Sequence, residues 1–361
     1  MKRILLIFLI GAVLLGIVSC EKAQKTQESN IYKGITEKNV SEAEEDTVLK
    51  DTTQSAQVIP NQLPTDKTNL VIACDQAKNR VVVYDMDAYN RKNIEDATVW
   101  EFIPEANGTH NVSGVKYRSD TVFGNVVIMC ASGGYAAIVK YPEKEVVWSV
   151  ANSGYNPHSI EILPNGDVVV ASSQGNTLRL YYTSALLNDN KAVISSLDYT
   201  LNDAHGVLWD PEYNCLWALG GDRIVCYKIS EGRLHADTSR TVQLPSGGGH
   251  SLSADYADKK KLWISVASGV LRFDKEEMNF EDNYEHRSLL SRTNIKGFGN
   301  NLNGHFVFCY PSKTNTAVSE SWQTGMLTYV YYKENGEAAV SGCKSLSSAY
   351  YKVMIFYGEY Q

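Results

Sequence analysis

Three histidines stand at nearly constant steps along the chain, each followed by a small residue and an alternating strand pattern. They are His158 in NPHSIEILP, His205 in DAHGVLWDP and His250 in GGHSLSADY, separated by 47 and 45 residues. One further step in each direction leads to Ser113, 45 residues before His158, and to Lys296, 46 residues after His250. Because a constant step places side chains at equivalent positions of successive repeats, we expect these five to meet at one site.

Three kinds of chemistry fit this set, and the residues leave all three open. His158, His205 and His250 could bind a divalent metal such as Mn, Zn or Ca, with one coordination position left open for catalysis. Alternatively, the site could act on an acidic sugar as a β-eliminating lyase. Lys296 or a histidine would then neutralise the uronate carboxylate, and another histidine or Tyr351 would move the proton. In the third interpretation the imidazoles bond only to backbone and water. No Asp or Glu shares the register, and Glu161 and Asp203 are the nearest carboxylates.

Other candidates carry weaker signals. Ser113 and His110 are expected at the rim of the site, and Trp322 in SESWQT could stack on a sugar ring. Arg118 is expected on the outer surface of its repeat. The chain contains no GxSxG, Walker A, GxGxxG or HExxH motif.

The elements that would position these residues repeat with the same period. Each start is followed by a turn and an apolar strand, as in NVVIMCAS, DVVVASSQ and KLWISVAS, and then by a third strand such as TLRLYY or VLRFD. A variable fourth strand completes the unit. A repeat of about 45 residues with four strands is typical of a β-propeller blade. In a propeller the first strand of each blade lines the central channel, which would bring the repeated residues together.

The ring is expected to close by pairing the two ends of the body. NLVIACDQAKNRVVVYD provides a second and third strand without a first, and AYYKVMIFYGEY provides a first strand without partners. Their pairing would leave no exposed sheet edge and predicts an all-β propeller of six blades, with seven also compatible. Tyr350 or Tyr351 would then supply the sixth axial residue.

The first 67 residues predict export and anchoring. Residues 1–19 form a signal peptide with a basic start and a short apolar core that ends in IVSC, which resembles the lipobox of bacterial lipoproteins. Cys20 would carry the acyl chains, and Glu21 favours the outer membrane. Residues 20–67 are polar and are expected to form a disordered tether, and residues 68–361 form the propeller.

The amino-acid composition indicates which kinds of partner this protein can bind. The net charge of -7 argues against nucleic acid as a partner, and a monomer held at the membrane by its lipid is expected. The 22 tyrosines suit β-sheets and also carbohydrate surfaces. Besides Cys20 there are six cysteines without a CxxC pair, which we interpret as buried thiols.

The stretches PHSIEILPNGDVVVASS, AHGVLWDPEYNCLWALGG and GGHSLSADYADKKKLWISVASGVLRFD resemble a family of uncharacterised bacterial propeller lipoproteins. The resemblance implies a fold and a compartment. A looser similarity to propeller polysaccharide lyases of the oligogalacturonate lyase type implies that His158, His205 and His250 hold a divalent metal. We therefore predict a cell-envelope propeller that binds or processes an extracellular glycan at its central funnel, with an acidic sugar as one candidate. The alternative is a non-catalytic scaffold that presents one face to a protein partner.

Overall fold

The structure is a computed structural model that describes residues 69–153 and 155–360. The predicted signal peptide, the acylated Cys20 and the tether therefore lie outside the described residues and remain predictions. No helix in the described part of the chain is long and apolar enough to cross a membrane.

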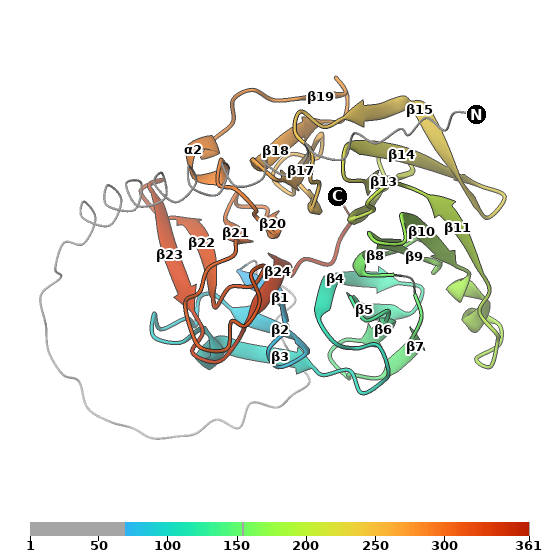
Figure 1. Cartoon of the computed structure of the whole chain (residues 1–361), viewed down its shortest axis with the longest axis horizontal. Coiled ribbons are helices and arrows are strands. Elements are labelled where there is room, and N and C mark those ends of the chain that lie inside the picture. Colours follow the sequence, from blue (N-terminus) through green and yellow to red (C-terminus); the bar gives the residue numbers. More distant parts are fainter. Residues whose placement is uncertain (1–68, 154, 361) are drawn as a thin grey trace, which may run out of the picture. The chain divides into compact units, whose positions relative to one another are not determined.

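Six four-stranded antiparallel sheets are arranged around a central axis, which confirms the predicted six-bladed propeller (Figure 1). From the inner to the outer strand, the sheets contain β24 (Tyr350–Ile355), β1 (Leu70–Asp75), β2 (Arg80–Asp85) and β3 (Thr98–Phe102); β4 (Val112–Thr121), β5 (Gly124–Ala131), β6 (Ala136–Lys140) and β7 (Val146–Val150); β8 (Pro157–Ile162), β9 (Val168–Ser172), β10 (Thr177–Tyr181) and β11 (Ser196–Thr200); β12 (Gly206–Asp210), β13 (Cys215–Leu219), β14 (Arg223–Ser230) and β15 (Arg233–Gln243); β16 (Ser251–Ala254), β17 (Lys261–Val266), β18 (Gly269–Asp274) and β19 (Asn279–Phe280); and β20 (Gly297–Asn300), β21 (Phe306–Cys309), β22 (Met326–Tyr332) and β23 (Ala338–Lys344). We number these sheets blade 1 to blade 6. Short helices η1 (Ile94–Ala97), η2 (Thr183–Leu187) and α2 (Arg287–Leu290) lie in connections.

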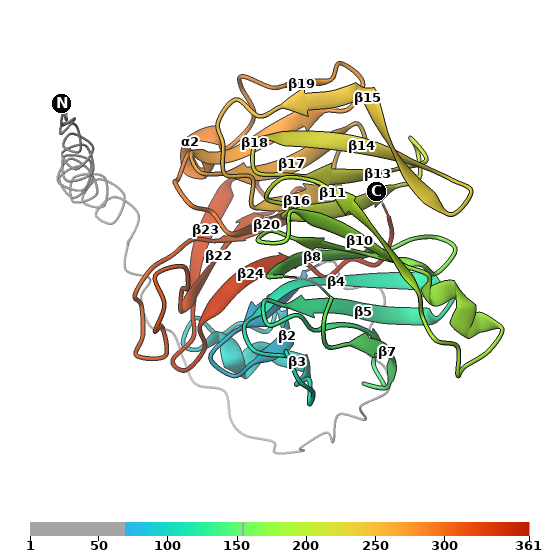
Figure 2. The ribbon, with the colours of Figure 1, turned by 45° about the vertical axis from the view of Figure 1, so that its right-hand side comes forward.

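Burial explains why the inner strands read as continuous apolar runs. Strands β1, β2, β8, β9, β12 and β13 are buried at every position, because neighbouring blades cover both faces of these sheets. The outer strand β11 alternates instead between exposed and half-buried residues, as a strand with one wet face does. In Figure 2 the inner strands β24, β4, β8 and β20 lie together in the middle of the ring.

The two ends of the body share blade 1, as predicted. Strand β24 pairs antiparallel with β1, with Val71 opposite Ile355 and Ala73 opposite Val353. The register shifts by one residue beyond Ala73, which marks a β-bulge beside Tyr351.

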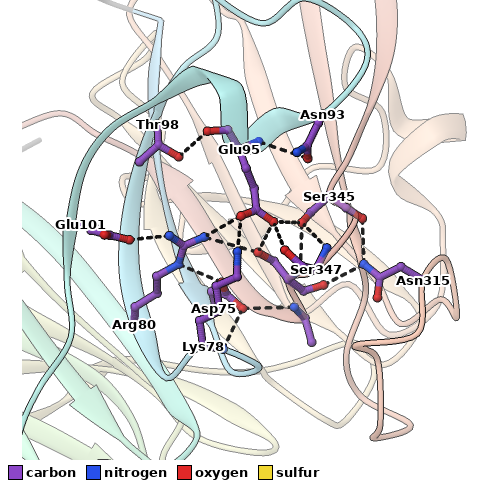
Figure 3. A network of polar contacts seen from close by, with 12 residues as sticks. Asp75, Lys78, Arg80, Asn93, Glu95, Thr98, Glu101, Asn315, Ser345 and Ser347 are labelled. Carbon is purple, nitrogen blue, oxygen red and sulfur yellow. Dashed lines mark hydrogen bonds and ion pairs between the residues drawn. The ribbon is translucent and has the colours of Figure 1, made fainter.

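A polar network fastens this closure from the side (Figure 3). The carboxylate of Glu95, in η1, accepts hydrogen bonds from Ser345, Ser347 and Ser348, which directly precede β24. Its other oxygen contacts Lys78 and Arg80 on the β1–β2 side of the blade. Glu95 thus connects the N-terminal part of blade 1, which supplies β1, β2 and β3, to the C-terminal segment that leads into β24. We call this group the closure network.

The last residues cross the far end of the central channel. Ser119 donates its amide hydrogen to the carbonyl of Gly358 at 3.0 Å, and the Tyr360 hydroxyl donates to the carbonyl of Ile162 at 2.8 Å. Tyr357 packs edge-on against Tyr256 at 4.7 Å. This segment therefore connects blades 2, 3 and 5 at the end of the channel opposite the strand starts.

Candidate functional site

The six axial residues occupy one structural position, at the start of each inner strand. Ser113 and His158 sit where the ladder to the second strand shifts by one residue, so each is the extra residue of a β-bulge. The amides of His205, His250 and Lys296 donate to Leu219, Ser265 and Cys309, which are also the ladder partners of the residues that follow. A bulge of this kind turns the side chain out of the sheet, here towards the channel.

The three imidazoles meet, as the repeat predicted. The rings of His158 and His205 stack with centroids 4.4 Å apart and planes 13° from parallel. His250 meets His205 edge-on, with centroids 4.8 Å apart. His158 and His205 are each 6% exposed, and His250 is half-buried. The constant step in the sequence therefore produces a continuous row of three rings at the channel mouth.

Tyr351 and Lys296 complete the two ends of this row. The Tyr351 hydroxyl lies 3.3 Å from Nδ1 of His158, and Lys296 Nζ lies 2.7 Å from Nε2 of His250. Tyr350, the alternative axial residue, points away and pairs its hydroxyl with Tyr84 at 2.7 Å in the blade core. Together, His158, His205, His250, Lys296 and Tyr351 form what we call the funnel site.

Two further lysines lie deeper in the channel. Lys352 donates to the carbonyl of His158 at 2.8 Å. Lys116 donates to the carbonyls of Ile160, at 2.5 Å, and Val207, at 2.8 Å. Both side chains are buried, and both amines donate hydrogen bonds to backbone carbonyls of the inner strands. The channel therefore contains a column of amines beneath the funnel site.

Burial decides the protonation of these groups. Burial first, and then the nearby Lys296, His205 and Lys352, lower the pKa of His250 to about 2. The pKa of His158 is also well below its usual range, first because of burial and then because of His205. Burial lowers the pKa of Lys116 and of Lys352 to about 8, and lowers that of Lys296. It raises the pKa of Tyr351, so the phenol keeps its proton at neutral pH.

The geometry does not support the predicted metal site. Within residues 69–153 and 155–360, no group of three or more His, Cys, Asp or Glu side chains is placed to hold a metal ion. The physical reason is the ring arrangement, because two stacked imidazoles cannot both direct an in-plane nitrogen lone pair at one point. In addition, Nε2 of His250 faces the Lys296 amine, and Nδ1 of His205 lies 2.9 Å from the carbonyl of Asp203. The carboxylate Oδ1 of Asp203 lies 3.2 Å from the same nitrogen of His205.

Arg118 is not on the blade surface, contrary to the expectation. It is 2% exposed and forms a two-pronged ion pair with Glu161, at 2.9 and 2.7 Å, between blades 2 and 3. Its guanidinium also lies 4.9 Å from the ring centre of Tyr360. Glu161, the nearby carboxylate noted in the sequence, is thus committed to Arg118 and lies 3.8 Å from Lys116.

The three rim candidates differ in position. Ser113 is fully buried and donates to the carbonyl of Pro157 at 2.5 Å, so its hydroxyl stabilises the bulge instead of facing a ligand. His110 is exposed in the connection before β4. Trp322 is 37% exposed, and its indole donates to Gln76 at 3.1 Å. A ligand contact by His110 or Trp322 stays a prediction.

Sequence reasoning missed Lys116 and Lys352, although a signal exists. Lys352 follows the axial Tyr351 by one residue, where the other five blades have Gly114, Ser159, Gly206, Ser251 and Gly297. A Cβ at Gly114 would lie 2.7 Å from the carbonyl oxygen of His158, which shows how closely the inner strands approach there. One lysine among five small residues is therefore the only long side chain at that level of the channel within the register.

The fold and the site define a six-bladed propeller with a cationic, histidine-lined funnel. The chain belongs to a family of unknown function (DUF6528), whose sequence model matches residues 24–313. Among curated proteins, none matches the chain.

Three solved structures are similar to it. A functionally unknown protein from Desulfotomaculum acetoxidans is 10% identical over 81% of this chain and 100% of the other, with a TM-score of 0.49. A protein of unknown function from Bacteroides caccae is 11% identical over 79% and 97%, with a TM-score of 0.51. Virginiamycin B lyase from Staphylococcus aureus is 13% identical over 76% and 80%, with a TM-score of 0.47. At these identities the similarity concerns the fold alone.

Proposed function

We propose that this protein binds an acidic glycan through the funnel site, with Lys296 as the contact to a uronate carboxylate. The observation that carries the proposal is the partner of Lys296. Among the described residues, the only hydrogen-bond partner of its side-chain amine is the neutral imidazole of His250. A buried amine without a carboxylate partner is costly, and an anionic ligand would relieve that cost.

The rest of the funnel site supports an anion of this kind. Lys352 adds a second amine beneath the imidazoles, and it too donates only to a backbone carbonyl among the described residues. The rings of His158 and His205 stack on each other and are each 6% exposed, so a ligand would meet their edges, and Tyr351 offers a phenol that can donate or accept. A sugar that carries one carboxylate matches a row of polar ring edges with an amine at one end.

A β-elimination is the finer form of the proposal. It would require Lys296 to neutralise the carboxylate, a neutral imidazole to take the α-proton and the protonated Tyr351 to assist the leaving oxygen. The pKa shifts keep the His250 imidazole and the Tyr351 phenol neutral, which are the protonation states in which a base and an acid begin their roles. Cleavage would be seen as growth of the ultraviolet band of an unsaturated uronate, whereas pure binding would leave the absorbance unchanged.

The deciding experiment is titration calorimetry with uronate oligosaccharides, neutral oligosaccharides of the same length and simple carboxylates. We expect binding of the uronates alone, and a loss of at least about tenfold in affinity in Lys296→Met, since a charged hydrogen bond contributes about 1.5–3 kcal/mol. The matched control is Lys333→Met, because the Lys333 side chain is exposed and its amine pairs with Glu337 at 3.1 Å, far from the axial register. Equal affinity of Lys296→Met, or equal binding of neutral sugars, would refute the proposal. Absence of any binding would favour the scaffold.

The predicted envelope location belongs to the same proposal, because an extracellular glycan requires an exported protein. It depends on Cys20 and is tested by metabolic labelling with a palmitate analogue. The label should appear on the wild-type protein and be absent from Cys20→Ala. A labelled Cys20→Ala variant would contradict the lipobox interpretation.

A further inference from the structure

A second cavity lies away from the axis, between blade 5 and blade 6. Its volume is 140 Å³, and its walls include the rings of Trp263, Tyr284, Phe298, Phe306 and Tyr332. The connection from β19 to β20, which carries α2, contributes Tyr284, Glu285 and His286 to the walls. Figure 1 shows this connection running beside blades 5 and 6. The cavity shares no residue with the funnel site.

The rings pack against one another at different angles around the cavity. Trp263 stands 75° from Tyr284 and 53° from Phe298, with ring centres 5.3 and 5.0 Å apart. Phe298 and Phe306 are 5.6 Å apart at 31°. The hydroxyl of Tyr332 lies 2.7 Å from Nε2 of His286, which fixes the Tyr332 ring from the other side. This is an aromatic box rather than a single stack.

The charged groups around the box are already bonded to one another. Arg272 pairs with Asp255 at 2.8 Å and with Glu281 at 3.1 Å, and Asn300 donates to Asp255 at 2.6 Å. The Arg272 guanidinium also lies 5.3 Å from the ring centre of Trp263, so this ring already contacts one cation. The buried indole nitrogen of Trp263 has no hydrogen-bond partner among the described residues. A ligand that needs several hydrogen bonds, such as a pyranose, would therefore find partners for few of its hydroxyls.

Charge gives the remaining requirement. Of the charged lining residues, Asp255 and Glu285 are acidic and Arg272 is basic, so the lining carries one excess negative charge. The Glu285 side chain is 72% exposed, which places a carboxylate at the opening towards solvent. Aromatic faces attract cations through their quadrupoles, with about 0.5–2 kcal/mol for each well-placed ring.

We propose that this box binds a quaternary ammonium group, such as the trimethylammonium head of choline or a betaine. Such a group carries a positive charge, has an apolar surface and demands no hydrogen bond. Its size also fits, because a cavity of about 150 Å³ holds one benzene ring. The proposal is independent of the glycan site, since neither ligand contacts residues of the other site.

The test compares choline with 3,3-dimethylbutan-1-ol, its uncharged carbon analogue of the same shape, by titration calorimetry. We expect choline to bind at least about tenfold more tightly, because only the cation gains from the ring faces and from Glu285. Glu285→Gln should weaken choline several-fold and leave the alcohol unchanged. Glu337→Gln, an exposed carboxylate on blade 6 outside the box, should change neither.

Four outcomes would overturn the proposal. Equal affinity for choline and the alcohol would mean a plain apolar cavity. A Glu285→Gln variant with wild-type affinity would place the cation elsewhere, as would choline-induced NMR shifts that avoid the Trp263 indole. Absence of saturable choline binding would mean that the cavity holds only water. Because Glu285 is exposed, its substitution leaves the fold intact, and the result reports on the site.

Discussion

Glu95 is the centre of the closure network, and its substitution by Gln should destabilise the propeller in a pH-dependent way. Burial alone would raise the pKa of Glu95, but hydrogen bonds from Lys78, Ser345 and Ser347 outweigh it and lower the pKa to about 2. The shift from 4.5 amounts to about 3 kcal/mol at 1.36 kcal/mol per unit. Lys78 is 31% exposed, and Glu101, which pairs with Arg80, is 40% exposed, so solvent screens one side of the network. We therefore expect a loss of about 2 kcal/mol at pH 7.

The sign follows from linkage. A carboxylate with a lowered pKa in the folded state stabilises that state at pH values above its unfolded pKa, near 4.5. The contribution is lost as the pH falls from 4.5 towards 2. Equilibrium urea unfolding, followed by tryptophan fluorescence, should therefore give a large difference between wild type and Glu95→Gln at pH 7. By pH 3 the difference should fall below half of that value.

Two results would refute this reasoning. A Glu95→Gln variant as stable as wild type at pH 7 would mean that the serines and Lys78 gain nothing from the charge. A loss that is equally large at pH 7 and pH 3 would mean that the effect comes from packing and not from ionisation. The control is Glu337→Gln, whose exposed i,i+4 pair with Lys333 should contribute no measurable stability.

The remaining predictions concern the channel. Burial lowers the pKa of Lys352 to about 8, so the unfolded protein binds the Lys352 proton more tightly than the folded protein does. The free energy of unfolding of the wild type, relative to that of Lys352→Met, should therefore rise between pH 8 and 10.5 when it is measured by urea unfolding. Arg118→Met should cost about 3–5 kcal/mol, because Glu161 would be left buried without its ion pair, and Arg223→Met, a surface pair, should cost almost nothing in the same assay. Uronate affinity should stay nearly constant from pH 5 to 7, since the pKa of His250 lies near 2. At higher pH the affinity should decrease as Lys296 loses its proton, and this decrease should occur at a pH below the usual lysine pKa. A steep change in affinity near pH 6 would contradict this. Chelators should leave the melting temperature unchanged, and a fall of several degrees would restore the metal hypothesis.

The sequence was most informative where the fold repeats. The step of about 45 residues predicted the blades, and the unmatched strands at the two ends predicted the pairing of β24 with β1, which the structure confirms. It also predicted that His158, His205 and His250 meet, because equivalent positions of a ring converge on its axis. What it could not supply was the orientation of the rings. Whether three imidazoles stack or point at one ion depends on side-chain torsions, and no spacing encodes these.

Side-chain interactions between neighbouring blades could not be predicted from the sequence either. Arg118 looked like a surface residue because its own strand gives no reason to bury a charge. Its partner Glu161 stands 43 residues away, at a position of the next blade that is two residues earlier in the register, and the pair becomes visible only when the two inner strands lie side by side. The aromatic box has the same origin, because its rings come from two blades and a connection with no common period.

The partners of the channel cations differ between its two ends. At the far end, Arg118 and Lys116 share the carboxylate of Glu161, and the segment from Tyr357 to Tyr360 crosses between the blades. At the funnel end, the amines of Lys296 and Lys352 have an imidazole and a carbonyl as hydrogen-bond partners among the described residues. A carboxylate is also present there, because Asp203 Oδ1 lies 3.2 Å from Nδ1 of His205. The anion that we propose as ligand would therefore be attracted by the two amines and would have to bind without close contact to Asp203.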